Sequence, residues 1–374
     1  MSQINLKTIE THQPIGDFYI AKINAKDLYN ISTVDRLMIE MQSKENELIY
    51  RGIQREINEN KIQSLQDYLE SPDATFPNSI ILNVETQFVI SKSKDSLILK
   101  ATENTFSVID GQHRLESFRE FNYTDFELVV SIFIGLSIEE QARIFTIINS
   151  EQTKVNPSVQ MFQELHDKVY TPRKMAAKIT TLFAKDIDSP WRNKIKLLGV
   201  KDDLSTEGII SLSAFAKPII GLIYDDRRYH FLRAKILKEG INSIDKLEVS
   251  KSSISQFWKL YLQENEAAMY KILFNYFNAI SMIFKKDWKN KNSLLTKTTG
   301  YNALMLLFKD VFKVAESQRD FTEKNFYNLL IVLKEMDTTI NSTNYGASGE
   351  KASSDLYKKF KERLDLDLIH SQTS

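Results

Sequence analysis

The chain has 374 residues, 42% hydrophobic and 26% charged, which is enough for one large or two medium soluble domains with buried cores. It has no cysteine, which excludes disulfides, iron–sulfur clusters, thiolate metal sites and a cysteine nucleophile, and its five histidines lack the spacing of a zinc site. The net charge is zero, but residues 1–150 hold 14 Lys and Arg against 22 Asp and Glu, whereas residues 151–374 hold 35 against 27. The basic excess of the second half fits either an acidic partner or an ordinary lysine-rich surface.

The first part of the chain alternates between strand and helix patterns. The run FYIAKI predicts a strand followed by a short helix, and residues 58–71 show apolar residues at helical spacing up to Pro72. Further strands are expected at 76–84, 86–93, 96–102, 106–110 and 126–135, and helices at 112–121 and 136–150, the last one opened by a capping box of Ser137 and Glu140. This alternation predicts a compact α/β domain over residues 1–156.

The pattern changes after Pro157. Apolar residues then recur every three or four positions in long runs, at 159–170, 173–186, 206–224, 254–288, 301–316, 325–336 and 354–368. We therefore predict an all-α domain over residues 157–374, able to bind DNA or a protein partner. No apolar run is long enough to span a membrane and the first residues do not resemble a secretory signal, so a cytoplasmic protein with no membrane contact is expected.

Residues 106–121 read FSVIDGQHRLESFREF and contain a five-residue polar cluster, Asp110 to Arg114, between a strand-like run and an amphipathic run. One interpretation is a strand-to-helix turn in which Asp110 caps the helix and Gly111 supplies the bend. The other is a ligand site, in which backbone amides and Arg114 bind phosphate oxygens. In that case Asp110 could hold a magnesium ion or a water molecule, and His113 could donate a proton.

Two further polar clusters are candidates for the same site. Arg51, Gln54 and Arg55 precede the helix at 58–71, and Asn149, Gln152 and Thr153 follow the helix at 138–148. The alternative for the first cluster is a solvated helix start. The alternative for the second is a polar domain junction that ends at Pro157.

The pentapeptide DGQHR, after an apolar strand and before L-x-x-F, resembles the signature of the DGQHR-domain family. The blocks GDFYIAKINAKDL, IQREINENKIQSLQDYLE, FPNSIILNV and FTIINSEQTKVNP follow in that family's order, so the resemblance covers roughly residues 15–165. The family includes the B proteins of Dnd-type DNA phosphorothioation, described as transcriptional regulators. It also includes the B proteins of 7-deazaguanine DNA modification, which resemble nucleotide-hydrolysing partners of a modifying enzyme.

The resemblance implies an α/β (α+β) N-terminal domain of the ParB/sulfiredoxin type, in which a Gly-x-x-Arg turn holds nucleotide phosphates. Gly111 and Arg114 match that turn, with Gln112 and His113 between them. Asp110 and His113 are the candidate catalytic residues; the candidate nucleotide-binding residues are Gly111, Gln112, Arg114, Arg51, Gln54 and Arg55, with Asn149, Gln152 and Thr153 behind them and no metal ligand assigned.

Three functions stay open from the sequence. The first is a nucleotide-binding component of a DNA-modification or defence system, with ATP as the leading nucleotide, Mg²⁺ as an optional companion, and DNA and other modification proteins as partners. The second is a DNA-binding repressor of a phosphorothioation gene cluster without catalysis. The third is a ParB-like metal-dependent nuclease. Self-association is left open, as is hydrolysis of the nucleotide.

Overall fold

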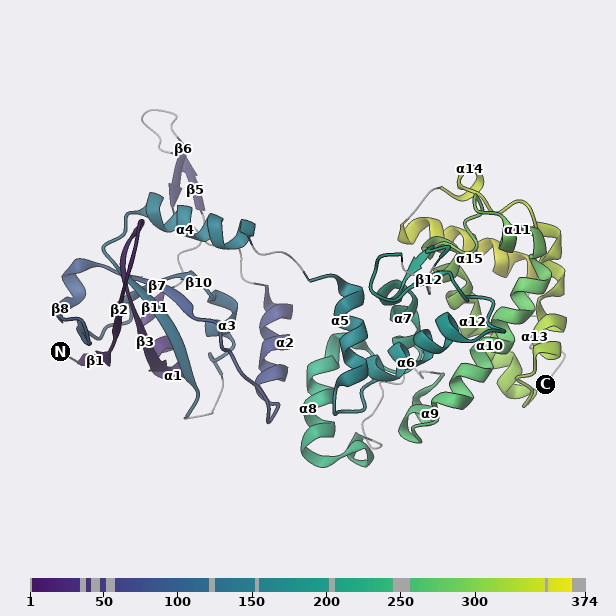
Figure 1. The fold of residues 1–374 in the computed structure, drawn as a ribbon, viewed down its shortest axis with the longest axis horizontal. Coiled ribbons are helices and arrows are strands. Elements are labelled where there is room, and N and C mark those ends of the chain that lie inside the picture. The colour runs from purple at the N-terminus through teal and green to yellow at the C-terminus, as the bar shows by residue number, and fades with distance from the viewer. Residues whose placement is uncertain are drawn as a thin grey trace. The chain divides into compact units, whose positions relative to one another are not determined.

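The computed structural model describes residues 2–33, 38–41, 48–51, 58–120, 125–151, 155–201, 206–244, 256–346 and 349–364. For residues 38–41, 48–51 and 149–151 the description covers the backbone alone. The chain divides into two compact units, Met1–Lys154 and Val155–Ser374. The first is mixed α/β and the second is mainly helical (Figure 1), which confirms the predicted fold class at that level. Within the described ranges, no helix is both long and apolar enough to cross a membrane.

A six-stranded mixed sheet forms the centre of the first unit, in the order β2-β3-β11-β7-β10-β4. β11 runs antiparallel to β3 and parallel to β7, and β10 runs antiparallel to β7. The middle strands β7 and β11 are nearly continuous apolar runs, typical of strands at the centre of a sheet with helices on its faces. The strands are β2 (Ile9–Gln13), β3 (Gly16–Asn24), β4 (Ser32–Thr33), β7 (Ile80–Val84), β10 (Phe106–Asp110) and β11 (Glu127–Ile134).

Two smaller sheets complete the strands of this unit. One is antiparallel, in the order β1-β9-β8, with β1 (Gln3–Lys7), β8 (Val89–Lys92) and β9 (Ser96–Lys100). The pairing of β8 with β9 confirms the predicted hairpin-type pair, and a 3₁₀ turn, Thr86–Phe88, precedes it. The other is the antiparallel pair β5 (Met38–Met41) and β6 (Leu48–Arg51). The sequence interpretation missed β1, β2, β4, β5 and β6, which are short or polar.

Helices cover the two faces of the six-stranded sheet differently (Figure 1). α1 (Ala25–Asn30), α2 (Glu59–Leu69) and α3 (Gln112–Glu116) contribute to the larger core with Leu82 and Val130. α4 (Ile138–Glu151) packs on the opposite face, where Ile109, Phe133 and Ile144 form a smaller core. The predicted capping box opens α4: the Ser137 amide donates to Glu140 at 2.8 Å, and the Glu140 amide donates to the Ser137 hydroxyl at 3.2 Å.

The second unit consists of helices around one continuous core, with a short parallel pair, β12 (Ile195–Lys196) and β13 (Ile210–Ser211). Its α-helices are α5 (Pro157–Gln163), α6 (Pro172–Lys185), α7 (Leu212–Ile220), α8 (Tyr229–Glu239), α9 (Trp258–Leu262), α10 (Glu266–Ile283), α11 (Lys285–Lys289), α12 (Thr298–Ser317), α13 (Glu323–Leu330), α14 (Ser342–Tyr345) and α15 (Glu350–Leu364); 3₁₀ segments span Glu164–His166, Asp226–Arg228, Ile241–Ile244 and Ile331–Met336.

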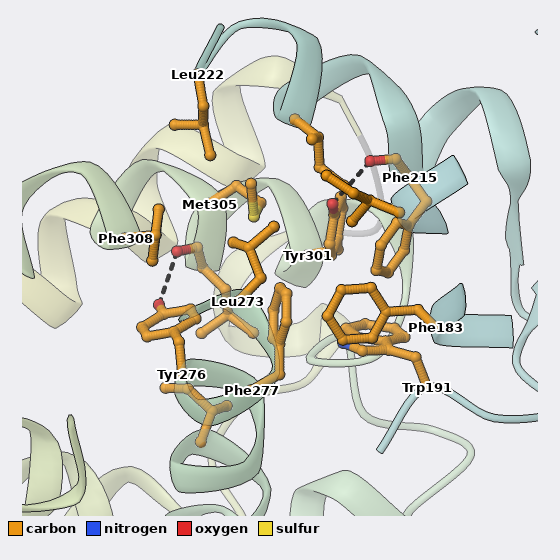
Figure 2. Close-up of a cluster of buried hydrophobic side chains, with 14 of the residues drawn as sticks. Phe183, Trp191, Phe215, Leu222, Leu273, Tyr276, Phe277, Tyr301, Met305 and Phe308 are labelled. Carbon is orange, nitrogen blue, oxygen red and sulfur yellow. Dashed lines mark hydrogen bonds between the residues drawn. The ribbon is translucent and has the colours of Figure 1, made fainter. Parts of the chain in front are cut away.

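Aromatic side chains fill the centre of this core (Figure 2). Trp191, Phe215 and Tyr301 are completely buried and lie within 5.5 Å of one another, measured between ring centroids. The Tyr301 hydroxyl donates to the Phe215 carbonyl at 2.7 Å, and the Tyr276 hydroxyl donates to the Leu304 carbonyl at the same distance. The hydroxyl of each of these two buried tyrosines therefore has an acceptor, as buried polar groups require.

Candidate functional site

The Asp110–Arg114 turn begins at a bulge in β10. Val108 pairs with Leu82 and Asp110 pairs with Ile81, so Ile109 is an extra residue on this strand. Ile109 is buried on the α4 face of the sheet, with Phe133 and Ile144. Residues directly opposite one another in an antiparallel pair share a face, so the bulge also directs Asp110 to the face that Ile81 occupies. The bulge thus sets the position of Asp110, whose Oδ2 accepts from Nη2 of Arg114 on α3 at 3.2 Å.

Gly111 joins the strand to the helix in a conformation that suits glycine. Its φ is 98° and its ψ is 12°, in the left-handed region, and no side chain caps α3 at this position. A Cβ on Gly111 would lie 3.0 Å from Nη2 of Arg114 and 3.1 Å from Cγ1 of Ile80. Both the backbone conformation and the close approach of Arg114 therefore require glycine here.

The Arg114 guanidinium lies against this glycine and is largely buried, with 20% of its side chain exposed. Its Nη1 donates to the Asn78 carbonyl at 2.6 Å, and its Nη2 donates to the Ser79 carbonyl at 3.1 Å and to Oδ2 of Asp110 at 3.2 Å. Burial lowers the pKa of Arg114 from its ordinary value, and the Asp110 carboxylate offsets part of that effect. Arg114 thus fastens the turn to the residues that precede β7.

His113 joins the turn to the start of α2. Its Nε2 accepts a hydrogen bond from the Asn58 backbone amide at 3.3 Å, so the neutral ring carries its proton on Nδ1. Burial lowers the pKa of His113 below its ordinary value and the positive charge of Lys61 lowers it further, while Asp110 acts in the opposite direction. Asn58 also caps α2, because its side-chain oxygen accepts from the Lys61 amide at 3.2 Å. His113 is therefore held as a neutral acceptor.

A family model described as DndB, DNA-sulfur modification-associated, matches residues 6–201. The matched range is 196 of the 374 residues and contains every strand of the six-stranded sheet together with α5 and α6. The chain belongs to the DndB family. No curated protein and no solved structure matches it. The predicted resemblance to the B proteins of Dnd phosphorothioation systems is confirmed, and membership associates the protein with DNA sulfur modification.

The structure of this DndB-family chain brings four predicted residues together: Asp110, Gly111, His113 and Arg114 lie in one turn between β10 and α3. Gln112 belongs to the same turn, but its side chain is buried, with 6% exposed. Arg119 pins the segment after α3 to α2, because its Nη2 lies 3.2 Å from Oε2 of Glu59. The turn is therefore anchored on both sides, to the start of β7 and to the start of α2.

The side chains of the remaining predicted site residues lie outside the described parts of the chain. Arg51 ends β6, where its backbone pairs with Met38, and its side chain lies outside the described parts, as does that of Asn149 in α4. Gln54, Arg55, Gln152 and Thr153 lie outside the described residues. Their roles stay predictions. Within the described ranges, no group of three His, Asp or Glu side chains could hold a metal ion.

Sequence reasoning missed three residues that position the turn: Asn58, Asn78 and Ser79. Asn58 had a local signal, since an asparagine directly before an amphipathic run is a typical helix cap. Asn78 and Ser79 had none, because they act through their carbonyl oxygens on a side chain 35 to 36 residues away. Every residue has a backbone carbonyl, so the residue type does not reveal which carbonyl will accept a hydrogen bond from a distant side chain.

The helical unit carries a basic segment in and after α11. Lys285, Lys286, Lys289 and Lys291 are exposed, and among the described residues no ion pair involves them. The acidic residue of this segment, Asp287, is buried, and its carboxylate accepts from the Thr338 amide at 2.6 Å. The lysine charges are thus presented to solvent without a compensating carboxylate from α11, so this segment is a candidate interface for a polyanion.

Proposed function

We propose that this chain is a DNA-associated component of a DNA sulfur-modification system and that it binds a nucleotide at the Asp110–Arg114 turn. ATP is the first nucleotide to test, and the α/β unit would be of the ParB/sulfiredoxin type. DNA and other proteins of the modification system would be its partners. Family membership supports the association with DNA modification, and the nucleotide is the further step of the proposal.

The contact between Gly111 and Arg114 is the observation that carries the nucleotide proposal. Because Gly111 has no side chain, the Arg114 guanidinium packs directly against the backbone of the turn, and the first amides of α3 have no side-chain cap. Arginine and backbone amides are the donors that phosphate oxygens accept from. Arg114 can keep its bonds to Asn78 and Ser79 while a phosphate replaces the Asp110 carboxylate on Nη2. Asp110, once released, would be the residue able to hold a water molecule or Mg²⁺.

Nucleotide titration of the purified full chain tests this proposal. Wild type should bind at least one of ATP, CTP and GTP in calorimetry, and Arg114→Ala should bind it at least about tenfold more weakly, because a charge-assisted hydrogen bond contributes about 1.5–3 kcal/mol. Arg119→Ala is the matched control, since Arg119 lies on the same segment but pairs with Glu59. Unchanged binding of all three nucleotides by a folded Arg114→Ala protein would refute the proposal.

A second candidate function, a DNA-binding repressor without catalysis, is favoured by the exposed lysines of α11. It requires promoter DNA to bind in the absence of nucleotide, with an affinity that falls steeply as salt rises. The two candidates separate in one experiment, a DNA titration with and without ATP. Equal DNA affinity in both arms, together with no measurable nucleotide binding, would support the repressor and exclude the nucleotide-dependent component.

A further inference from the structure

A groove runs between α4 and the sheet face that α4 covers only in part. It encloses about 520 Å³ and is walled by β3, β7 and β11 on one side and α4 on the other. Pockets of this size suit small organic ligands. The walls are mostly apolar: Ile15, Phe18, Ile81, Phe133, Ile144 and Ile147.

Two features make the groove suitable for a flat, aromatic ligand. Phe18 and Phe133 lie with their ring centroids 5.1 Å apart and their planes tilted by 34°. Ile147, on the opposite wall, leaves 46% of its surface exposed although it is a large apolar side chain. A nucleobase inserted here would stack on the half-buried Phe18 ring and on the exposed Ile147, while Phe133, with 6% exposed, packs against Phe18 and supports it.

The groove is connected to the Asp110–Arg114 turn through the sheet. Ile81 lines the groove and is the residue directly opposite Asp110 across β7 and β10. Ser131 also lines the groove, and its hydroxyl donates to the Ser79 hydroxyl at 3.1 Å. The carbonyl of the same Ser79 accepts from Arg114. Two short links therefore connect the groove to the proposed phosphate site: the strand pairing of Ile81 with Asp110, and the hydrogen bond between Ser131 and Ser79.

Charge in the groove also suits a nucleotide. Arg143 belongs to the α4 wall and is exposed, and in the described part of the chain no ion pair neutralises it. Among the described residues that line the groove, none carries a carboxylate side chain. A cation beside an apolar slot attracts a ligand that combines a flat ring with a negative charge.

We propose that this groove binds the base of the nucleotide whose phosphates lie at the Asp110–Arg114 turn. The inference rests on the proposed nucleotide function and adds to it the location of the base. It assigns Phe18, supported by the buried Phe133, as the stacking surface, Ile147 as the opposite wall, and Arg143 as a second cation for the ligand. Binding should therefore depend on the base and not on the phosphates alone.

Calorimetric titration of the full chain with ATP and with inorganic tripolyphosphate separates the two parts of the site. Ile147→Glu places a carboxylate in the groove at an exposed position, so it should weaken ATP binding at least tenfold and leave tripolyphosphate binding unchanged. Ile138→Glu is the matched control, because Ile138 is exposed on the same helix but lines a different hollow, beside Asn83 and Ser107. It should bind both ligands as wild type does.

The outcomes distinguish this inference from the proposed function. Wild-type ATP affinity in Ile147→Glu would overturn the base site alone and assign the groove to another occupant, such as an apolar helix of a partner. Absence of both ATP and tripolyphosphate binding in wild type would overturn the nucleotide function and this inference with it. A photoreactive 8-azido-ATP gives a test on unmutated protein: labelling of residues 13–18 or 143–148 is expected, and labelling confined to other segments would overturn the base site.

Discussion

The guanidinium of Arg114 occupies the space that a side chain at Gly111 would need. Its Nη2 lies 3.0 Å from the position of a Cβ on Gly111, and the same nitrogen donates to Asp110. The position of the Arg114 guanidinium therefore depends on the absence of a side chain at residue 111, and a change at either residue should disturb the other.

Gly111→Ala should destabilise the first unit more than an equivalent glycine substitution elsewhere in it. The positive φ costs about 1–3 kcal/mol for a residue with a side chain. Displacing Arg114 and Ile80 adds an overpacking cost of about 1–3 kcal/mol. Denaturant unfolding followed by circular dichroism measures the sum. Gly16→Ala is the control, because Gly16 has a φ of 132° but nothing within 4 Å of the added Cβ. Equal losses in the two variants would contradict the packing of Arg114 against Gly111.

The strand, the turn and the capping box of this region were predictable because their signals are local. FSVID followed by a glycine reads as a strand that ends in a bend, and Ser137 with Glu140 reads as a helix start. The bulge at Ile109 was not predictable, because it depends on the register against β7, where Val108 pairs with Leu82 and Asp110 with Ile81, 26 and 29 residues earlier. α3 also ends at Glu116, earlier than the expected end near residue 121, so an amphipathic pattern alone overestimated its length.

The helical unit shows the same limit. The run 254–288 reads as one long amphipathic helix, yet it divides into α9, α10 and α11. Glu264 adopts a φ of 50°, and Asn265 then caps α10 by accepting from the Ala268 amide at 3.0 Å. The asparagine was a usable signal, whereas the left-handed glutamate was not, because glutamate seldom takes that conformation.

His113 should make the stability of the first unit fall as the solution is acidified. Its pKa is lowered in the folded state, so below the ordinary value of 6.5 the unfolded chain takes up a proton that the folded chain resists. The contribution of His113 to the free energy of unfolding is thus fully present above pH 6.5 and is lost as the pH falls toward its pKa in the folded state. Unfolding of wild type and His113→Gln between pH 7.5 and 5 measures the difference, which should shrink with acidification.

His12 provides the opposite sign and serves as a check on that experiment. The hydrogen bond to Asp17 raises the pKa of His12, so its contribution is present at low pH and disappears as the pH rises through the folded pKa. His12→Gln should therefore leave the acid-side loss attributed to His113 in place. If His113→Gln and wild type lost stability in parallel from pH 7.5 to 5, the neutral role of His113 would be excluded.

The exposed lysines of α11 and the following turn should control the salt dependence of DNA binding. Replacing Lys285, Lys286, Lys289 and Lys291 by alanine should weaken binding to duplex DNA. It should also reduce the slope of log K against log salt by about 0.9 for each DNA phosphate that the protein no longer neutralises. Fluorescence anisotropy with a labelled duplex at several salt concentrations measures both quantities.

A change of equal charge on α15 controls for the total charge of the protein. Lys351, Lys358, Lys359 and Lys361 are also exposed, and replacing them by alanine likewise removes four positive charges, but from α15. If this variant lost as much affinity and slope as the α11 variant, DNA binding would reflect the overall charge of the helical unit and α11 would have no special part.

Gly300→Ala should destabilise the helical unit strongly, because Gly300 lies where two backbones approach closely. A Cβ there would stand 2.3 Å from the Leu294 carbonyl oxygen and 2.5 Å from the Leu295 Cα, both of which belong to backbone that cannot rotate away. Overpacking of this kind costs about 1–3 kcal/mol or more.

Gly221→Ala is the matched control: Gly221 follows the last residue of α7 with a φ of −64°, and the nearest atom to an added Cβ would be 3.4 Å away. It should be neutral or stabilising by about 0.4–1 kcal/mol, because alanine restricts the unfolded chain. Thermal unfolding followed by tryptophan fluorescence reports on this unit, which contains all three tryptophans. An unaltered unfolding temperature in Gly300→Ala would show that the segment before α12 packs less closely than the structure describes.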